Sequence, residues 1–100
     1  MKLSLVVPCY NEAENVAAFQ EAVIGAFHDC GYDYEIIYVN DGSRDATLHN
    51  LKKLFAAQKC PVKVISFSRN FGKEAGIYAG LQQAAGQYIS LIDADFAATS

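Results

Sequence analysis

The sequence lacks the features that mark membrane-spanning, secreted and nucleic-acid-binding chains. Its apolar segments are far shorter than the roughly 20 residues that a membrane span needs. The first of them, Leu3 to Val7, is too short for the core of a secretory signal and is followed by Pro8. Basic residues form no run and the formal net charge is −3, whereas binding to a phosphate backbone leaves a basic footprint. We therefore expect a cytoplasmic protein that has no nucleic-acid partner.

The spacing of the cysteines excludes the common cysteine-based sites. There are three, an odd number, at Cys9, Cys30 and Cys60, and none has the spacing of a zinc ligand pair or a CxxC motif. We expect reduced, partly buried thiols, with a catalytic cysteine as the less favoured alternative. The chain has 100 residues and 52% of them are hydrophobic, which predicts one packed domain rather than disorder.

Two kinds of segment alternate along the chain. Short apolar runs with β-branched residues predict buried strands, and apolar residues at helical spacing between them predict amphipathic helices. The strands are expected at 3–8, 34–40, 62–68 and 87–92, and the helices at about 13–30, 45–58 and 72–85. Pro8 should end the first strand because proline has no N–H to donate. The order predicts an α/β fold: a Rossmann-like parallel sheet with helices on both faces and right-handed crossovers.

The third predicted helix is rich in small residues: Ala75, Gly76, Ala79 and Gly80. A glycine inside a helix costs about 1 kcal/mol relative to alanine. Close packing of this helix on the sheet would offset that cost.

Polar residues follow all four predicted strands, where ligands bind in open parallel sheets. They are Tyr10, Asn11 and Glu12; Asn40, Asp41 and Ser43; Arg69, Asn70 and Lys73; and Asp93 and Asp95. Each also has a purely structural interpretation. Asn11 or Glu12 could begin a helix, and Ser43 or Asp45 could cap one. Asp41 with Gly42 is a common turn pair, and the cations could be solvated. The four groups together favour a binding site, because the sheet brings them to one edge.

Asp93 and Asp95 give the most specific signal. Residues two apart on an extended segment point the same way, and Ala94 leaves room between them. Two hard oxygen ligands on one side suit Mg²⁺ or Mn²⁺ shared with phosphate oxygens. The alternative is an acidic loop after a strand. Other nucleotide folds fit poorly, because no G-x-G-x-x-G follows the first strand and the segment around Gly72 and Lys73 is not a P-loop.

Four segments carry a resemblance to a known family. "VVPCYNEAENV", "EIIYVNDGSRDAT", "SRNFGKEAGIYAGL" and "GQYISLIDAD", in that order and spacing, resemble inverting family 2 glycosyltransferases with the GT-A fold. The third segment is most similar to the branch that glycosylates polyisoprenyl phosphates, such as dolichol-phosphate mannose synthases and bactoprenol glucosyltransferases. The resemblance covers about residues 3 to 95. It implies strand order 3-2-1-4, with the first and fourth strands side by side.

The resemblance also implies roles for individual residues. Pro8, Asn11 and Glu12 would line the nucleotide pocket, with Tyr10 near the base. Asp41 would bind the uracil or guanine, and Asp93 would approach the ribose and the metal. Asp95 would bind the Mg²⁺ or Mn²⁺ that bridges the diphosphate. Phosphate-facing roles would fall to Arg69 and Lys73.

The sequence departs from the family after Asp95, where Phe96–Ser100 do not follow the pattern of the branch, and members of the family have longer catalytic domains. We therefore expect residues 1–100 to be the nucleotide-sugar-binding half of the domain, with the catalytic base and the acceptor site beyond residue 100. The parent enzyme would act on a lipid phosphate at the cytoplasmic face of the membrane. The chain alone should be inactive and should form homo-oligomers. Two alternatives stay open: a nucleotidyltransferase, which usually has a glycine-rich basic loop after its first strand, and a non-catalytic self-associating module.

Overall fold

The computed structural model describes residues 2–94, which form four strands and three helices in strict alternation. In chain order these are β1 (Lys2–Cys9), α1 (Val16–Phe27), β2 (Asp33–Asp41), α2 (Thr47–Ala57), β3 (Val62–Phe67), α3 (Lys73–Gln83) and β4 (Tyr88–Leu91). The predicted succession of strands and helices is therefore confirmed.

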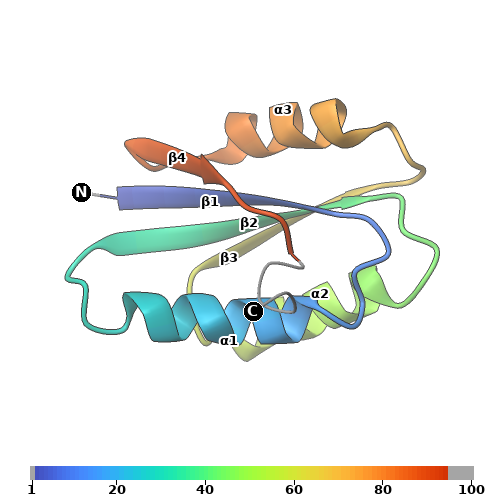
Figure 1. Ribbon diagram of the computed structural model, residues 1–100. Coiled ribbons are helices and arrows are strands. Elements are labelled where there is room, and N and C mark those ends of the chain that lie inside the picture. The colour runs from blue at the N-terminus through green and yellow to red at the C-terminus, as the bar shows by residue number, and fades with distance from the viewer. Residues whose placement is uncertain (1, 95–100) are drawn as a thin grey trace.

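The strands form one parallel sheet in the order β3-β2-β1-β4 (Figure 1). Strand β1 lies between β2 and β4, so that Leu3 is paired with Tyr34 on one side and with Tyr88 on the other. The chain proceeds outward from β1 to β3 and then returns to place β4 on the opposite side of β1. The order of strands therefore reverses between β1 and β4, as the resemblance implied.

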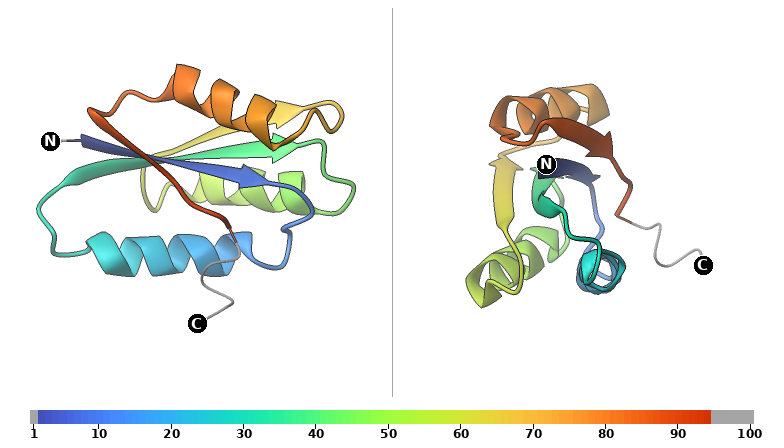
Figure 2. Two further views of the ribbon diagram at one scale, coloured as in Figure 1. Left: turned by 45° about the horizontal axis from the view of Figure 1, so that its top comes forward. Right: turned by 90° about the vertical axis from the view of Figure 1, so that its left-hand side faces the viewer.

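Helices cover both faces of the sheet, as expected from the sequence. Figures 1 and 2 show α1 and α2 together on one face and α3 alone on the other. Side chains alternate between the two faces along each strand. Leu5, Ile36 and Tyr38 belong to the larger core, under α1 and α2, whereas Val6 and Val39 belong to the smaller cluster that faces α3.

Helix α3 packs closely on the sheet through its small residues. Gly76 and Gly80 are both buried, and a Cβ atom added to Gly80 would lie 2.4 Å from Cγ1 of Val6. A Cβ atom on Gly76 would lie 3.4 Å from Cγ1 of Val39, which is ordinary contact. The predicted close packing is confirmed, and only the position of Gly80 strictly requires a residue without a side chain.

Several predicted boundaries were wrong by one to three residues. Strand β1 runs through Pro8 to Cys9 instead of ending at the proline. The carbonyls of Lys2 and Val6 accept hydrogen bonds from the β4 side, and Pro8, two residues after Val6, faces the same side beyond the last pair with β4. Its missing N–H therefore breaks no ladder bond.

Helix α1 is also shorter than predicted. It begins at Val16, because residues 12–15 form a turn in which the Glu12 carbonyl accepts the N–H of Asn15 at 2.9 Å. It ends at Phe27, and Gly31, with φ of +76°, lies in the following turn. Within residues 2–94, no helix is long and apolar enough to cross a membrane.

Candidate functional site

A pocket of about 160 Å³ lies at the carboxyl ends of the strands, where the strand order reverses. This is the location at which open parallel sheets bind ligands. Six of the residues predicted from the sequence line it together with Cys9: Pro8, Tyr10, Glu12, Asp41, Lys73 and Asp93. They come from the ends of β1 and β2, the start of α3 and the residues after β4. The sheet therefore brings together most of the predicted nucleotide-binding residues.

Asp41 anchors the loop between β3 and α3. Its side chain is almost buried, and Oδ1 accepts the N–H of Phe71 at 2.8 Å. Oδ2 accepts the N–H of Gly72 and the side-chain amide of Asn70, each at 3.1 Å. Next to it, Gly42 has φ of +66°, and a Cβ atom there would lie 2.1 Å from the backbone of Arg69. The loop thus lies directly against the end of β2, and the start of α3 is held beside the pocket.

Lys73 and Asp93 form an ion pair across the pocket. The distance from Nζ to Oδ1 is 3.3 Å, and both side chains remain largely exposed. Lys73 is the first residue of α3, where the helix dipole has its positive end. The pocket therefore combines a cationic part with the carboxylates of Glu12, Asp41 and Asp93.

Asn11 has a different environment from the one predicted. It has φ of +54°, its N–H donates to Oγ of Ser43, and its Oδ1 accepts the N–H of Arg44, both at 2.9 Å. In the same region the N–H of Glu12 donates to Oγ1 of Thr47 at 2.9 Å. These bonds join the loop after β1 to the loop after β2. Within the described residues, Asn11 therefore supports the pocket from outside its lining.

Asp45 was considered a possible cap of the second helix, but the N-cap position is Ala46, and Asp45 lies one residue before it. Its Oδ1 accepts the N–H of Thr47, the first residue of α2, at 2.9 Å, and also the Thr47 hydroxyl. The hydrogen bond from the Thr47 hydroxyl is the main reason that the pKa of Asp45 lies below its ordinary value. Its Oδ2 also accepts the N–H of Ala13 at 3.3 Å, so Asp45 contributes to the same connection between the two loops.

Arg69 is the second predicted residue that lies outside the pocket lining, as far as residues 2–94 show. Its guanidinium stacks over the ring of Phe71 at 4.7 Å from the centroid. Phe71 itself is about half exposed, so the stacked pair lies at the surface of the loop that Asp41 anchors.

Cys9 lines the pocket but is not suited to nucleophilic catalysis. Burial, with a smaller effect from the charge of Glu12, raises the pKa of its thiol to about 12. The thiol also donates to the carbonyl of Val7 at 3.4 Å. A cysteine nucleophile acts as a thiolate. The alternative of a catalytic cysteine is therefore not supported at this position.

Residues 2–94 contain no group of three or more clustered side chains that could hold a metal ion. The carboxylates of Glu12, Asp41 and Asp93 do line the pocket, and oxygen ligands are those that Mg²⁺ and Mn²⁺ prefer. Asp95, the second predicted ligand, lies outside the described residues.

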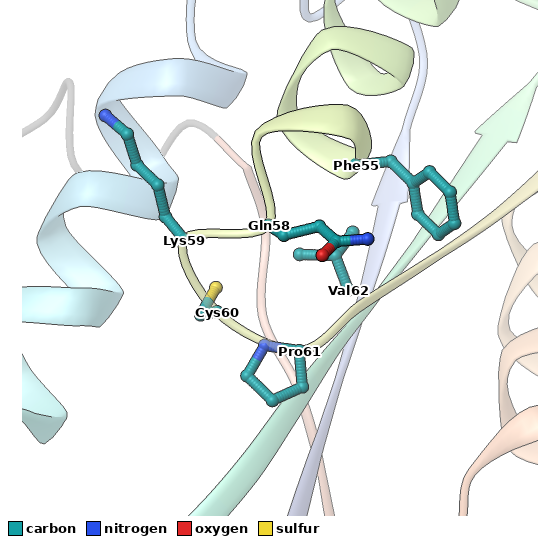
Figure 3. Close-up of a pocket in the computed structure, with 6 residues that line it drawn as sticks. All are labelled: Phe55, Gln58, Lys59, Cys60, Pro61 and Val62. Atoms are coloured by element: carbon teal, nitrogen blue, oxygen red, sulfur yellow. The ribbon is translucent and has the colours of Figure 1, made fainter.

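A larger cavity, of about 520 Å³, lies at the opposite end of the sheet, between the end of α2 and the start of β3 (Figure 3). It is lined by Phe55, Gln58, Lys59, Cys60, Pro61 and Val62. Lys59 extends away from the other side chains, and none of the predicted site residues contributes to the lining. This cavity has the larger volume, but the predicted polar side chains converge on the smaller pocket at the carboxyl ends of the strands. The smaller pocket is therefore the candidate binding site.

Comparison with known proteins identifies close sequence relatives. A family model described as glycosyl transferase family 2 matches residues 4–100. The chain is 48% identical over 93 residues to the protein CsbB of Bacillus subtilis (strain 168), covering 93% of this chain and 28% of that protein. It is 43% identical over 95 residues to a prophage bactoprenol glucosyl transferase homolog of Escherichia coli (strain K12), covering 95% and 31%. The chain thus spans less than a third of the length of these relatives.

Solved structures of GT-A glycosyltransferases share the fold. A structure of residues 1–349 of S. aureus TarS in complex with UDP matches with a TM-score of 0.79 and 28% identity, covering 95% of this chain and 28% of that one. The mannosyltransferase PcManGT from Pyrobaculum calidifontis, in complex with GDP-Man and Mn²⁺, matches with a TM-score of 0.75 and 22% identity, covering 93% and 27%. The latter match supports the fold alone. The predicted fold class is confirmed.

Proposed function

Because the chain belongs to glycosyl transferase family 2, we propose that its pocket at the carboxyl ends of β1 and β2 binds the nucleotide diphosphate of a sugar donor. The observation that carries the proposal is the convergence of six predicted residues on one pocket at the reversal of strand order. The TarS structure supports it, since that related protein is in complex with UDP. We propose UDP or GDP as the nucleotide.

The parent enzyme, in this proposal, transfers the sugar to a polyprenyl phosphate with inversion. The name of the E. coli relative supports this acceptor, because it describes a bactoprenol glucosyl transferase homolog. An oxygen of the acceptor phosphate attacks the anomeric carbon. The bond from that carbon to the diphosphate oxygen breaks, and its electron pair leaves with the nucleotide. Such an acceptor is a lipid of the cell envelope, and a nucleotide-sugar is a cytoplasmic metabolite, so we place the reaction at the cytoplasmic face of the membrane.

Asp41 has capacity for a base contact in addition to its contacts with the loop. A carboxylate offers about four acceptor sites, and the three bonds from the β3–α3 loop leave one of them free. We propose that this remaining site accepts a base N–H, and that Tyr10, which is 45% exposed, packs near the base. Pro8 and Glu12 would complete the wall of the pocket.

The charged residues of the pocket suit the diphosphate. Lys73 and the N-terminus of α3 present positive potential to the phosphates. Arg69, which stacks on Phe71 in the anchored loop, is a second candidate for a contact with the phosphates. We propose that Asp93 and Asp95 hold Mg²⁺ or Mn²⁺. When bound, the cation would neutralise charge on the leaving diphosphate.

We also propose that the 100-residue chain self-associates. Strand β4 lies at the sheet edge, where unpaired backbone groups favour association. Large apolar side chains are exposed on β4 and α3: Tyr78, Leu81, Tyr88, Ile89 and Leu91. Light scattering at several concentrations measures the molar mass, and a monomer throughout would contradict this part of the proposal.

Calorimetric titration tests the nucleotide site. UDP, GDP and UTP are titrated into the parent protein, into Asp41→Ala and into Asp33→Ala, a control in which an exposed aspartate at the other end of β2 is removed. We expect the parent and the control to bind a diphosphate alike. Asp41→Ala should bind it more weakly by roughly 1.5–3 kcal/mol, the range for a hydrogen bond to a charged group.

Equal diphosphate affinities in Asp41→Ala and the parent would show that Asp41 does not contribute to the nucleotide site. Preference for the triphosphate over both diphosphates would favour the nucleotidyltransferase alternative. Circular dichroism on each variant confirms that the compared proteins are folded.

A further inference from the structure

A buried charged network lies at the amino ends of the strands, away from the pocket. Glu35, in β2, is only 2% exposed. Its Oε2 accepts the Ser4 hydroxyl at 2.6 Å and the N–H of Ala85 at 2.8 Å, and its Oε1 lies 3.0 Å from Nζ of Lys63. One carboxylate thus joins β1, β2, β3 and the turn that leads from α3 into β4.

The same network fixes the α3–β4 turn from both ends. The N–H of Gly86 donates to Oγ of Ser4 at 2.8 Å, and Nζ of Lys63 donates to the carbonyl of Gln83, the last residue of α3, at 2.8 Å. The fit is tight, because a Cβ atom on Gly86 would lie 2.6 Å from Oγ of Ser4 and 2.8 Å from the carbonyl oxygen of Lys2. The turn therefore has one well-defined position against β1.

Strand β4 depends on such an anchor more than the other strands do. It has four residues paired with β1, and Tyr88, Ile89 and Leu91 are exposed. A strand whose side chains are not sorted between core and solvent specifies its register weakly. A slip of two residues would preserve which side chains share a face, yet would move Asp93 by about 6–7 Å along the strand direction. Asp93 would then lose its place beside Lys73 at the pocket.

We propose that Glu35 is a positioning residue: by holding the turn at Ala85 and Gly86, it sets the register of β4 against β1 and thereby places Asp93 at the pocket. The register part of the proposal depends on the contacts of residues 2–94 alone. Its consequence for ligand binding rests on the proposed nucleotide site.

Amide hydrogen exchange, measured by NMR, tests the register. The reporters are the amides of Gln87 and Ile92, which donate to the carbonyls of Lys2 and Val6 in β1. The reference is the amide of Ile36, which donates to Pro61 at the β2–β3 side. Nuclear Overhauser contacts between β1 and β4 report the register directly, since Leu5 is paired with Ser90 in the present one.

Glu35→Met removes both acceptor oxygens at similar volume. Protection of Gln87 and Ile92 should fall by roughly tenfold or more relative to Ile36, the effect expected when a hydrogen bond to a charged group is lost locally. Glu35→Gln should restore protection, because its single carbonyl oxygen can still accept from Ser4 and Ala85. Ser4→Ala is a milder variant that removes the bridge to Gly86. It should also lower the protection of Gln87 and Ile92 relative to Ile36, and it provides the test if Glu35→Met does not fold.

Tyr38→Phe is the control for general destabilisation. It removes a buried hydrogen bond of 2.8 Å to Gln20 from the same strand, on the face away from α3. It should lower the protection of all three amides together. The proposal is wrong if Glu35→Met or Ser4→Ala lowers the protection of all three amides by the same factor, because Glu35 then has only a general structural role. It is also wrong if these variants keep full protection and the nuclear Overhauser contacts of the present register.

A second measurement separates this proposal from the proposed function. In Glu35→Met the gain in UDP affinity that Mn²⁺ produces should be lost, and in Glu35→Gln it should be retained. If the parent protein binds no nucleotide, the proposed function fails, but the exchange experiment still decides whether Glu35 sets the register.

Discussion

The packing of α3 on the sheet predicts opposite effects for two glycine substitutions one helical turn apart. Gly76 and Gly80 both face the sheet. Alanine gains about 1 kcal/mol over glycine in a helix interior. At Gly76 the new methyl group would make an ordinary contact of 3.4 Å with Val39, so this gain should be realised. We expect Gly76→Ala to raise the free energy of unfolding by up to about 1 kcal/mol.

Gly80→Ala should destabilise the protein instead. Its Cβ atom would lie 2.4 Å from Cγ1 of Val6, which is fully buried in the central strand and cannot move aside. Overpacking of this kind costs typically 1–3 kcal/mol. After the helical gain of about 1 kcal/mol, the net loss should reach up to about 2 kcal/mol. The two variants should therefore differ by roughly 1–3 kcal/mol although the chemical change is the same.

Urea denaturation followed by circular dichroism measures both effects. Gly25→Ala in α1 is the matched control, because a Cβ atom there would meet no atom within 4 Å and only the helical gain applies. For a domain of this size, 1 kcal/mol corresponds to about 4–8 °C in Tm. Equal stability of Gly80→Ala and Gly76→Ala would contradict this prediction, because it would mean that α3 can lift from the sheet at no cost.

Three further predictions concern the pH dependence of stability, the reactivity of a thiol and the loop between β1 and α1. Burial alone would raise the pKa of Glu35, but its hydrogen bonds hold that pKa below the ordinary value of about 4.3. The stabilisation that the ionised Glu35 contributes is therefore complete above the ordinary pKa, and it is lost as pH falls through the lower, folded-state pKa. The unfolding free energy of the parent should then fall more steeply in acid than that of Glu35→Gln. Parallel acid profiles of the two proteins would contradict this. Cys9, whose pKa is raised to about 12, should resist alkylation by iodoacetamide at neutral pH until the protein unfolds. The half-buried Cys30 should be alkylated in the folded state. Mass spectrometry identifies which of the two thiols is modified. Asn11→Ala should destabilise the protein by about 1–2 kcal/mol more than Asn11→Gly. Both variants lose the hydrogen bond to Arg44, but only alanine is strained at φ of +54°. Equal melting temperatures of the two variants would contradict this prediction.

The fold could be predicted because apolar periodicity records which face of each element is buried. Leu5, Val7 and Ile36 lie in the core that the pattern indicated, and the order of the elements determined a parallel sheet. Boundaries were less predictable, since they depend on backbone hydrogen bonds. Proline would break a central strand in general, yet Pro8 is accommodated because the neighbouring strand β4 ends before reaching it.

The site could be predicted in part, because the ends of parallel strands meet at one edge whatever their loops do. This rule brought Tyr10, Asp41 and Asp93 to one pocket. It could not predict that Asp41 would accept the backbone N–H of Phe71, thirty residues away. Every residue except proline has a backbone N–H, so the sequence does not indicate which one a carboxylate will bind. Glu35 was also missed, although a charged residue directly before the apolar residues 36–39 of a predicted buried strand was a visible signal.

We propose that the pocket binds a nucleotide diphosphate with the help of a divalent cation that Asp93 and Asp95 hold. The direct measurement is calorimetric titration of UDP in Mn²⁺ and in chelator, with the parent protein, Asp95→Asn and the control Asp33→Asn. Asparagine keeps the shape and removes one negative charge, so Asp95→Asn should lose most of the gain from Mn²⁺. Its metal-free binding should be unchanged or slightly improved, because less repulsion opposes the diphosphate. The parent and Asp33→Asn should bind UDP more tightly with Mn²⁺ than in chelator. Equal affinity of the parent in both conditions would show that no divalent cation takes part in binding.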